Sequence, residues 1–325
     1  MREIVVELSQ GVFLDLGSVD NDDLDRGQLL RALPAWQWHE FTAADQTAKR
    51  IAGANVVISN KCVLDREILS RAEHLRLIAV AATGTNNIDL DSAREFGITV
   101  CNARDYATQA VTQHTITFIL NLLSSQVFYR DRVRSGDWSR TDQFCLIDSP
   151  IRQVAGLNLG IIGNGVLGKS VADMAKKLGM NVLVAEHRGQ KPRPDHLVFE
   201  DVVAHSDVIS IHCPLNDETR GLFDRAMMQR MKRTAVLINT ARGGIVVEED
   251  LVSCLRDGII AGAGVDVLTR EPPPADHPLL AADIPNLLVT PHNAWASKTA
   301  RQALLDQLAS VIRAFERGQP LNRVV

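Results

Sequence analysis

The chain has 325 residues, of which 46% are hydrophobic and 23% are charged, a composition typical of globular proteins. Its 35 basic and 39 acidic side chains give a formal net charge of −4, which leaves no basic excess for binding nucleic acid or an anionic membrane surface. Because a single hydrophobic core rarely serves more than about 250–300 residues, the length predicts two domains.

Cysteine usage and the N-terminal residues indicate a reducing compartment. The five cysteines are odd in number and contain no C-x-x-C pair, which argues against a disulfide framework or a zinc site. The first ten residues are charged at positions 2, 3 and 7 and lack the apolar core of a signal peptide. No run approaches the ~20 apolar residues that cross a bilayer. We therefore expect a cytoplasmic protein with no metal site and no membrane partner.

Short apolar runs rich in Val, Ile and Leu alternate with helical segments along the chain. The runs barely alternate with polar residues, which is typical of strands buried on both faces of a parallel sheet. In the first part of the chain we predict strands at Gly11–Leu16, Asn55–Ser59, Leu75–Ala81 and Ile98–Asn102. In the second part we predict strands at Leu157–Ile162, Asn181–Ala185, Asp207–His212, Ala235–Asn239, Gly262–Val267 and Leu287–Thr290.

Two predicted helices separate and follow these sets of strands. Thr108–Arg130 lies between the sets, and Lys298–Arg317 comes after the last strand. Strands that alternate with helices predict βαβ units and an α/β fold with two doubly wound parallel-sheet domains. The order of elements predicts that residues 104–291 form one domain, inserted into a second domain made of residues 1–103 and 292–325.

The segment Ser135–Pro150 is predicted to be an irregular connector within the inserted domain. It carries two large aromatic side chains, Trp138 and Phe144. We expect these aromatic rings to pack against another surface, such as that of a second subunit.

A glycine motif follows the first strand of the second set: Gly163, Asn164, Gly165, Val166, Leu167 and Gly168. In a G-x-G-x-x-G motif between a strand and a helix, Gly163 permits the tight turn and Gly165 lets a pyrophosphate approach the backbone. Gly168 lets the helix pack closely on the strand, and the phosphates lie at the helix N-terminus. The motif predicts that the inserted domain is a Rossmann domain that binds NAD; the alternative is an ordinary glycine turn in a βα unit.

An acidic residue after the next strand bears on the choice of cofactor. Glu186 lies 18 residues beyond Gly168, close to the spacing of about 20 residues expected for a carboxylate that binds the adenosine ribose. A carboxylate there favours NAD, because it would repel the 2′-phosphate of NADP. NADP stays open, since four basic residues that follow could neutralise that phosphate: His187, Arg188, Lys191 and Arg193.

Three side chains that follow strands beyond the glycine motif form a candidate catalytic set. Arg242 follows the strand that ends at Asn239, Glu271 follows the strand Gly262–Val267, and His292 follows the last strand. Ligands of doubly wound sheets bind at the carboxyl ends of the strands. All three side chains are therefore predicted to face one crevice.

This set matches the needs of 2-keto acid reduction. The guanidinium of Arg242 suits a substrate carboxylate, and His292 can donate a proton to the carbonyl oxygen near neutral pH. Glu271 would fix the imidazole tautomer and favour its charged form, and Asp266, at a strand end, could bond the nicotinamide carboxamide. Each residue alone could be a solvated or structural side chain, so the prediction depends on their occurring together.

The chain resembles the D-isomer-specific 2-hydroxyacid dehydrogenase family over nearly its whole length. The matching stretches are Gly163–Gly168, His212–Leu215, Ile238–Gly244, Gly264–Val267, Glu271–Pro272 and Thr290–His292. The resemblance implies a flavodoxin-like substrate domain, formed by residues 1–103 and 292–325, that contains the inserted Rossmann domain. It also implies that Arg242 binds the substrate carboxylate, that His292 is the acid/base and that Glu271 is its partner.

The same resemblance implies further contacts and an assembly. The substrate loop would be Ala81–Thr85, with Ala82, Thr83 and Gly84 facing the keto acid. Family members form dimers through the cofactor domain, which implies a homodimer with the helix Thr108–Arg130 at the contact. Additional cofactor contacts are implied at Thr108, His212, Cys213, Pro214, Thr219, Thr240, Ala241 and Asp266.

Within the family, several stretches resemble glycerate dehydrogenase, also called hydroxypyruvate reductase: Val80–Asp89, Cys101–Thr108, Asp142–Cys145 and Ala294–Ser297. The expected substrates are D-glycerate and hydroxypyruvate, and also glyoxylate. The alternatives are a phosphoglycerate-type or other D-2-hydroxyacid dehydrogenase, or a dinucleotide-sensing binding protein with little turnover.

Three features of the sequence refine or depart from this resemblance. Glu271 argues against a formate dehydrogenase, which carries Gln there. Residues 1–10 precede the usual first strand, either as an extra edge or as a start-site artefact. Asn293 replaces the apolar residue that relatives usually carry beside the histidine.

Overall fold

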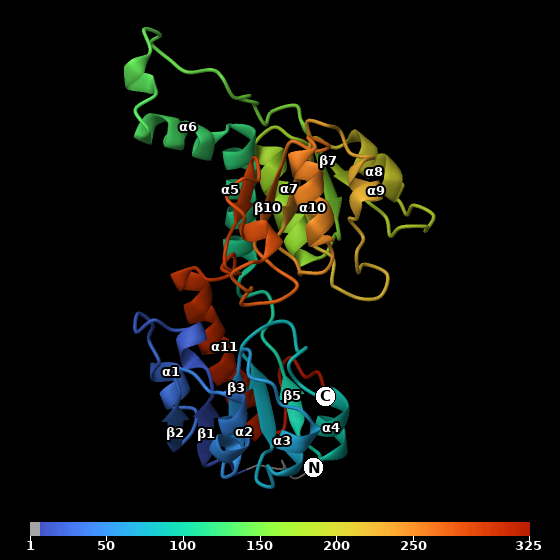
Figure 1. The fold of residues 1–325 in the computed structure, drawn as a ribbon. Helices are drawn as coiled ribbons and strands as arrows, with labels where there is room; N and C mark the ends of the chain where they lie inside the picture. Colours follow the sequence, from blue (N-terminus) through green and yellow to red (C-terminus); the bar gives the residue numbers. More distant parts are fainter. Residues whose placement is uncertain (1–6) are drawn as a thin grey trace. The chain divides into compact units, whose positions relative to one another are not determined.

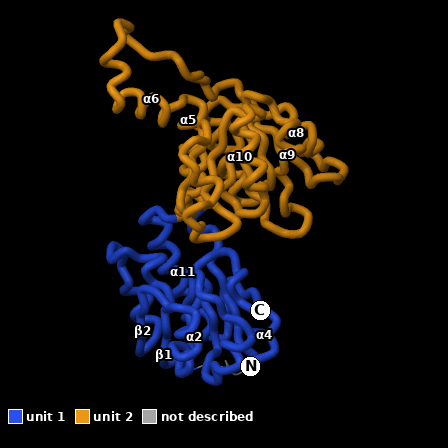
Figure 2. Tube along the Cα trace, viewed as in Figure 1, with its two compact units in different colours: residues 1–107, 296–325 blue, residues 108–295 orange. Residues whose placement is uncertain are grey.

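Two parallel sheets contain the named strands of residues 7–325, the part of the chain that the computed structural model describes. Each sheet belongs to one of two compact units (Figures 1 and 2). Unit 1 comprises residues 1–107 and 296–325, and unit 2 comprises residues 108–295. His292, which the sequence assigned to the substrate domain, lies in unit 2. The prediction for residues 1–10 falls mostly outside the described residues.

The sheet of unit 1 has the order β2-β1-β3-β4-β5, and its strands are parallel. This order is the flavodoxin-like arrangement. Its strands are β1 (Gln10–Phe13), β2 (Ala35–Trp38), β3 (Val56–Ser59), β4 (Leu77–Val80) and β5 (Thr99–Cys101). Its helices are η1 (Leu16–Ser18), α1 (Gly27–Leu30), α2 (Ala44–Ile51), α3 (Arg66–Ser70), α4 (Leu90–Glu95) and α11 (Lys298–Glu316).

Strand β2 is the one strand of this sheet that the sequence analysis missed. It lies at the sheet edge, and its side chains alternate between exposed and half-buried. The rings of Trp36 and Trp38 stack at 4.9 Å between centroids. A Cβ on Gly11 of the neighbouring strand would lie 2.6 Å from the Trp36 ring. The edge strand therefore depends on aromatic packing across to β1 rather than on a continuous apolar run.

The sheet of unit 2 has the order β11-β10-β9-β8-β6-β7 and is also parallel. A single parallel bridge from Ala185 to Leu197 adds a further position beside β7, which gives the Rossmann order with the reversal between β6 and β8. Its strands are β6 (Asn158–Ile162), β7 (Asn181–Val184), β8 (Val208–Ile211), β9 (Val236–Asn239), β10 (Gly262–Val265) and β11 (Leu287–Val289). The predicted fold class is confirmed.

The helices of unit 2 lie before its first strand and between its strands. They are α5 (Thr108–Leu123), α6 (Gln126–Arg134), η2 (Trp138–Arg140), α7 (Val166–Lys177), α8 (Phe199–His205), α9 (Arg225–Met228), α10 (Glu248–Arg256) and η3 (Pro278–Leu280). No helix within residues 7–325 combines the length and apolar character needed to span a bilayer.

The predicted helix Thr108–Arg130 is wrong as a single element, because the chain breaks between α5 and α6. Ser125 adopts a φ of 50°, in the left-handed region that ends helices. Its hydroxyl donates to the carbonyl of Pro150 at 2.7 Å and accepts from Ser149 at 2.9 Å. The next helix therefore leaves in a new direction, and Figure 1 shows α6 and the loop after it extending away from the sheet.

Helix α5 packs on β9 and β10 at a position where a strand glycine is required. Gly264 of β10 is buried, and a Cβ on it would lie 2.8 Å from the Phe118 ring of α5. Phe118 is 4% exposed. The close approach of helix and sheet therefore depends on the absence of a side chain at position 264.

We predict that Gly264→Ala lowers the free energy of unfolding by about 1–3 kcal/mol, because overpacking displaces a buried ring. Urea unfolding measures the change. Gly53→Ala is the control, since its Cβ would lie 3.8 Å from Gln10 Oε1 and should be neutral or stabilising. Equal unfolding midpoints for the two variants would contradict the prediction.

Candidate active site

Three neighbouring strands of unit 2 end at the same level. Asn239 of β9, Val265 of β10 and Val289 of β11 are aligned across the sheet. Because the carboxyl ends of parallel strands lie on one edge, the loops that follow meet there. Within three residues of these strand ends come the polar side chains Arg242, Asp266 and His292.

Glu271 and His292 are in direct contact. Nδ1 of His292 lies 2.5 Å from Oε2 of Glu271, and the two side chains are 27% and 31% exposed. The other carboxylate oxygen of Glu271 accepts the N–H of Leu268 at 2.8 Å. An ionised carboxylate only accepts hydrogen bonds, so the imidazole carries its proton on Nδ1 and presents Nε2 to a ligand. The structure thus joins the two side chains that the sequence paired.

Asp266 determines the turn that carries His292. The backbone of His292 has a φ of 52°, which is uncommon for a residue other than glycine, and its N–H donates to the carbonyl of Asp266 at 2.8 Å. The buried Asp266 carboxylate accepts the N–H groups of Asn293 and Ala294 at 2.9 and 3.0 Å and the hydroxyl of Thr290 at 2.6 Å. The imidazole is therefore positioned through residue 266.

A second turn, after β9, carries Arg242. The side chain of Asn239 accepts the N–H of Ala241 at 3.1 Å and donates to the carbonyl of Arg242 at 2.9 Å. Next to it, a Cβ on Gly243 would lie 2.1 Å from the carbonyl of Leu268, so the Arg242 turn packs directly on the loop that carries Glu271. The structure places Arg242 at the same sheet edge as the His292–Glu271 pair.

His114 of α5 is a polar residue at this edge that the sequence analysis missed. Its Nε2 lies 3.0 Å from the Thr290 hydroxyl and 3.8 Å from an oxygen of Asp266. Because that hydroxyl donates to Asp266, it accepts from His114. Burial lowers the pKa of His114, and the charge of Asp266 opposes the shift. The neighbouring Thr115 contacts the Thr240 hydroxyl at 3.1 Å. Helix α5 carries several other polar residues, so the sequence offered no signal that singled out His114.

The glycine loop fits a dinucleotide. Gly163 has a φ of 97°, and a Cβ on it would lie 2.5 Å from the backbone nitrogen of Cys213. A Cβ on Gly168 would lie 2.0 Å from the carbonyl of Gly163. At Gly165, in contrast, a Cβ would meet nothing within 4 Å, and no side chain caps α7, whose N-terminus begins there. A helix N-terminus without a side-chain cap, beside open space at Gly165, is what pyrophosphate binding requires.

His212, the residue that follows β8, supports this assignment. Its Nε2 lies 2.8 Å from the Ser210 hydroxyl, whereas its buried Nδ1 has no hydrogen-bond partner among residues 7–325. Burial lowers the pKa of His212 to about 4, so the ring is neutral near pH 7. A buried polar atom without a protein partner costs free energy unless a ligand or water satisfies it, which is consistent with the predicted cofactor contact.

Glu186 is already bonded within the protein. Its carboxylate accepts from the guanidinium of Arg193 at 2.6 and 2.9 Å, and from the backbone and ring of His187 at 2.9 and 2.8 Å. Arg193 and then His187 hold the pKa of the Glu186 carboxyl well below its usual range. The predicted hydrogen bonds from the ribose to Glu186 must therefore compete with these donors.

The other predicted site residues divide between the two units. In unit 2, the Thr219 hydroxyl bonds the Pro214 carbonyl at 2.7 Å and so closes the loop after β8. Thr108 begins α5, and Ala241 lies in the turn before Arg242. Ala82, Thr83 and Gly84 lie in unit 1, and their substrate-binding role stays a prediction. No group of three or more His, Cys, Asp or Glu within residues 7–325 could hold a metal ion.

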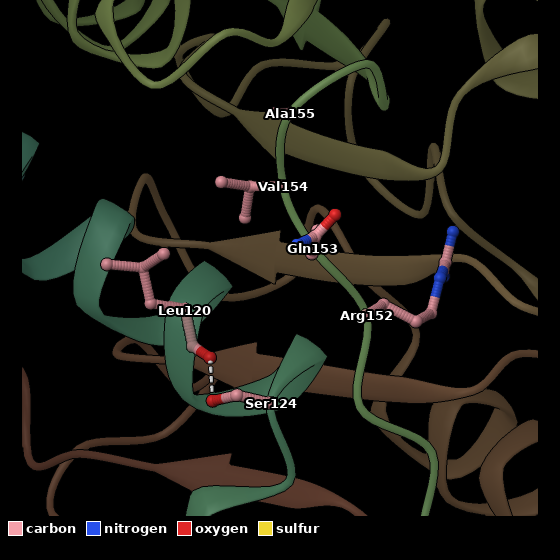
Figure 3. Close-up of a pocket in the computed structure, with 6 residues that line it drawn as sticks. All are labelled: Leu120, Ser124, Arg152, Gln153, Val154 and Ala155. Carbon is pink, nitrogen blue, oxygen red and sulfur yellow. Dashed lines mark hydrogen bonds between the residues drawn. The ribbon is translucent and has the colours of Figure 1, made fainter.

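A hollow of about 390 Å³ in unit 2 lies away from this site. Its residue Arg152 pairs with Asp207 at 3.1 Å and donates to the carbonyl of Thr234. Both partners precede strands, so the hollow is at the amino ends of the sheet, opposite His292. Its lining, shown in Figure 3, consists of Leu120, Ser124, Arg152, Gln153, Val154 and Ala155.

Comparison with known proteins agrees with the geometry. The family model "D-isomer specific 2-hydroxyacid dehydrogenase, NAD binding domain" matches residues 116–294, more than half of the chain. This chain belongs to the D-isomer-specific 2-hydroxyacid dehydrogenase family. It is an NAD-dependent oxidoreductase of that family, and unit 2 contains the NAD-binding domain.

Individual relatives align over most of their length. Glycerate dehydrogenase of Methylorubrum extorquens is 45% identical over 292 residues, which cover 88% of this chain and 92% of that protein. Hydroxypyruvate reductase of Blautia hydrogenotrophica is 34% identical over 288 residues, with coverages of 87% and 89%. A crystal structure of a Thermus thermophilus protein matches with a TM-score of 0.85 at 34% identity, covering 97% of this chain and 100% of that one.

The bonds of Glu186 lead to a prediction about cofactor choice. In Arg193→Ala, the Glu186 carboxylate loses its positive partner and repels a 2′-phosphate. We expect the ratio of NADPH Kd to NADH Kd to rise about 10-fold, or ~1.4 kcal/mol. Fluorescence titration of each cofactor measures it. Arg256→Ala is the control, because Arg256 pairs with Asp283 instead, at 2.8 Å. An unchanged ratio in Arg193→Ala would show that Arg193 has no part in the choice.

Proposed function

We propose that this dehydrogenase reduces hydroxypyruvate to D-glycerate with NADH, and also reduces glyoxylate. The observation that carries the proposal is the 2.5 Å contact between His292 and Glu271 at the sheet edge that also carries Arg242. An acid/base, its carboxylate partner and a guanidinium are the protein groups that reduction of a 2-keto acid requires.

Each of the three side chains has a defined task in this proposal. Arg242 binds the substrate carboxylate through two parallel N–H groups. His292, in its imidazolium form, donates the Nε2 proton to the carbonyl oxygen as it becomes the hydroxyl. Glu271 accepts the Nδ1–H bond, which fixes the ring and stabilises its positive charge. NADH supplies the hydride when it is bound.

The choice of substrate follows the relatives and the sequence. Two of the similar proteins are named glycerate dehydrogenase and hydroxypyruvate reductase. The second candidate, a phosphoglycerate-type or other D-2-hydroxyacid dehydrogenase, would use the same three side chains on a different acid. A steady-state panel of hydroxypyruvate, glyoxylate, pyruvate and phosphohydroxypyruvate separates them. We also propose a reducing compartment such as the cytoplasm, because all five cysteines are unpaired.

We predict that His292→Ala lowers kcat for hydroxypyruvate reduction by ~10²–10⁴-fold, as for loss of a general acid, with little change in NADH Kd. Stopped-flow kinetics and cofactor titration give the two quantities. His74→Ala, on the surface of unit 1, is the control. A near-normal kcat would refute the role of His292, and NADH binding by a wild type that reduces none of the four acids would favour a dinucleotide-sensing protein.

We further propose that a second copy of the chain covers the arm, defined as residues 126–150. Its helix α6 has no buried side chain, and Phe144 and Ile147 are 90% and 77% exposed. The arm has a defined shape, because Arg132 pairs with Asp137 at 2.8 Å and with Asp148 at 3.0 Å. Large apolar side chains on an ordered projection favour burial in an interface, and the family resemblance implies that the partner is identical.

Phe144→Glu combined with Ile147→Glu is predicted to convert a dimer into a monomer, because charges replace apolar contacts. Light scattering coupled to size-exclusion chromatography measures the mass. Val63→Glu introduces a charge at another exposed apolar position, in unit 1, and should leave the dimer intact. A wild-type protein that is monomeric at micromolar concentration would refute this assembly.

A further inference from the structure

The loop after β10, which carries Glu271, is held largely by side chains. Residues Pro272, Pro273 and Pro274 have no N–H group to donate. The N–H of Leu268 donates to Glu271 itself at 2.8 Å, and the N–H of Thr269 donates to a carboxylate on another element, that of Glu248, at 2.7 Å. The position of Glu271 therefore depends on what fixes Glu248.

Glu248 begins helix α10 and also binds the far end of the same loop. Its Oε2 lies 3.2 Å from Nε2 of His277, whereas Oε1 receives the Thr269 bond. The side chains of His277 and Glu248 are only 7% and 12% exposed. One carboxylate thus joins the two ends of the segment 269–277, with one oxygen on each.

Both hydrogen bonds need a carboxylate. Nδ1 of His277 accepts the N–H of Leu279 at 3.3 Å, so the ring carries its proton on Nε2 and donates it to Glu248. A glutamine at position 248 has one accepting oxygen and one donating nitrogen. If its oxygen keeps the Thr269 bond, its nitrogen faces the Nε2–H of His277 as a second donor, and one contact is lost.

The loop also contacts the turn that carries Arg242. A Cβ on Gly243 would lie 2.1 Å from the carbonyl of Leu268 and 2.4 Å from the nitrogen of Thr269. The residue that donates to Glu248 is therefore packed against the Arg242 turn. A shift of the loop would change the placement of Glu271 relative to both His292 and Arg242.

We propose that Glu248 is a positioning residue for the reaction: together with His277 it fixes the loop that brings Glu271 to His292. This inference rests on the proposed function of the His292–Glu271 pair. Glu248 acts through Glu271 and makes no contact with the imidazole of His292 among those that the structure records.

The test compares Glu248→Gln with Glu249→Gln in the whole enzyme. Glu249 is the next residue of α10 and is exposed. The variant Glu249→Gln therefore removes the same charge from the same helix end. We expect Glu248→Gln to lower kcat/KM for hydroxypyruvate by ~10–100-fold, as small misplacements of reacting groups do. NADH Kd should change less than 2-fold. Glu249→Gln should match wild type in both.

The ¹⁵N nuclear magnetic resonance signal of the His292 ring distinguishes positioning from simple loss of stability. Glu271 accepts the Nδ1–H of His292, so Glu271→Gln should change the chemical shift of that nitrogen. Glu248→Gln should change it in the same direction by a smaller amount, because it loosens the loop that holds Glu271.

Two outcomes separate the claims. A wild-type Nδ1 chemical shift in Glu248→Gln, with a changed shift in Glu271→Gln, overturns the positioning role alone. No change in either variant overturns the proposed His292–Glu271 pair. Should Glu248→Gln fail to fold, His277→Phe replaces it, because this ring keeps the volume and removes the Nε2–H donor to Glu248. The same change of the His292 signal in that variant supports the proposal, and its absence refutes it.

Discussion

The site depends on the hydrogen bonds that the buried carboxylate of Asp266 accepts. It accepts the N–H groups of Asn293 and Ala294 and the hydroxyl of Thr290, and these bonds hold His292 in the left-handed region. Burying an ion is costly unless hydrogen bonds compensate it, and the short turn after β11 supplies them. The carboxylate that follows β10 thus fixes the turn after β11, and with it the position of the His292 imidazole.

The cofactor side of unit 2 depends on the absence of side chains in its glycine loop. Gly163 and Gly168 leave no room for a Cβ, whereas Gly165 faces open space. The backbone can therefore meet a pyrophosphate while the helix stays against its strand. Glu186 adds a feature of this chain, since its carboxylate is already neutralised by Arg193. The negative charge of Glu186 therefore repels the 2′-phosphate of NADP less than an unpaired carboxylate would.

The sequence predicted what depends on local pattern and missed what depends on contacts between distant residues. The apolar runs predicted the buried strands, and their positions just after strands marked Arg242 and His292 as candidate site residues. Strand β2 was missed because it is an exposed edge stabilised by tryptophan packing. The break at Ser125 depends on a bond to Pro150, and the bonds of Glu186 depend on Arg193 folding back, so periodicity could not reveal either.

The most direct test is the protonation of His292, read by ¹⁵N nuclear magnetic resonance of histidine-labelled enzyme. The His292→Gln spectrum assigns its two ring nitrogens. Contact with Glu271 predicts that the neutral ring carries its proton on Nδ1, and that Glu271→Gln changes the shift of that nitrogen. A neutral ring protonated at Nε2, with shifts unaffected by Glu271→Gln, would contradict an acid/base oriented by this carboxylate.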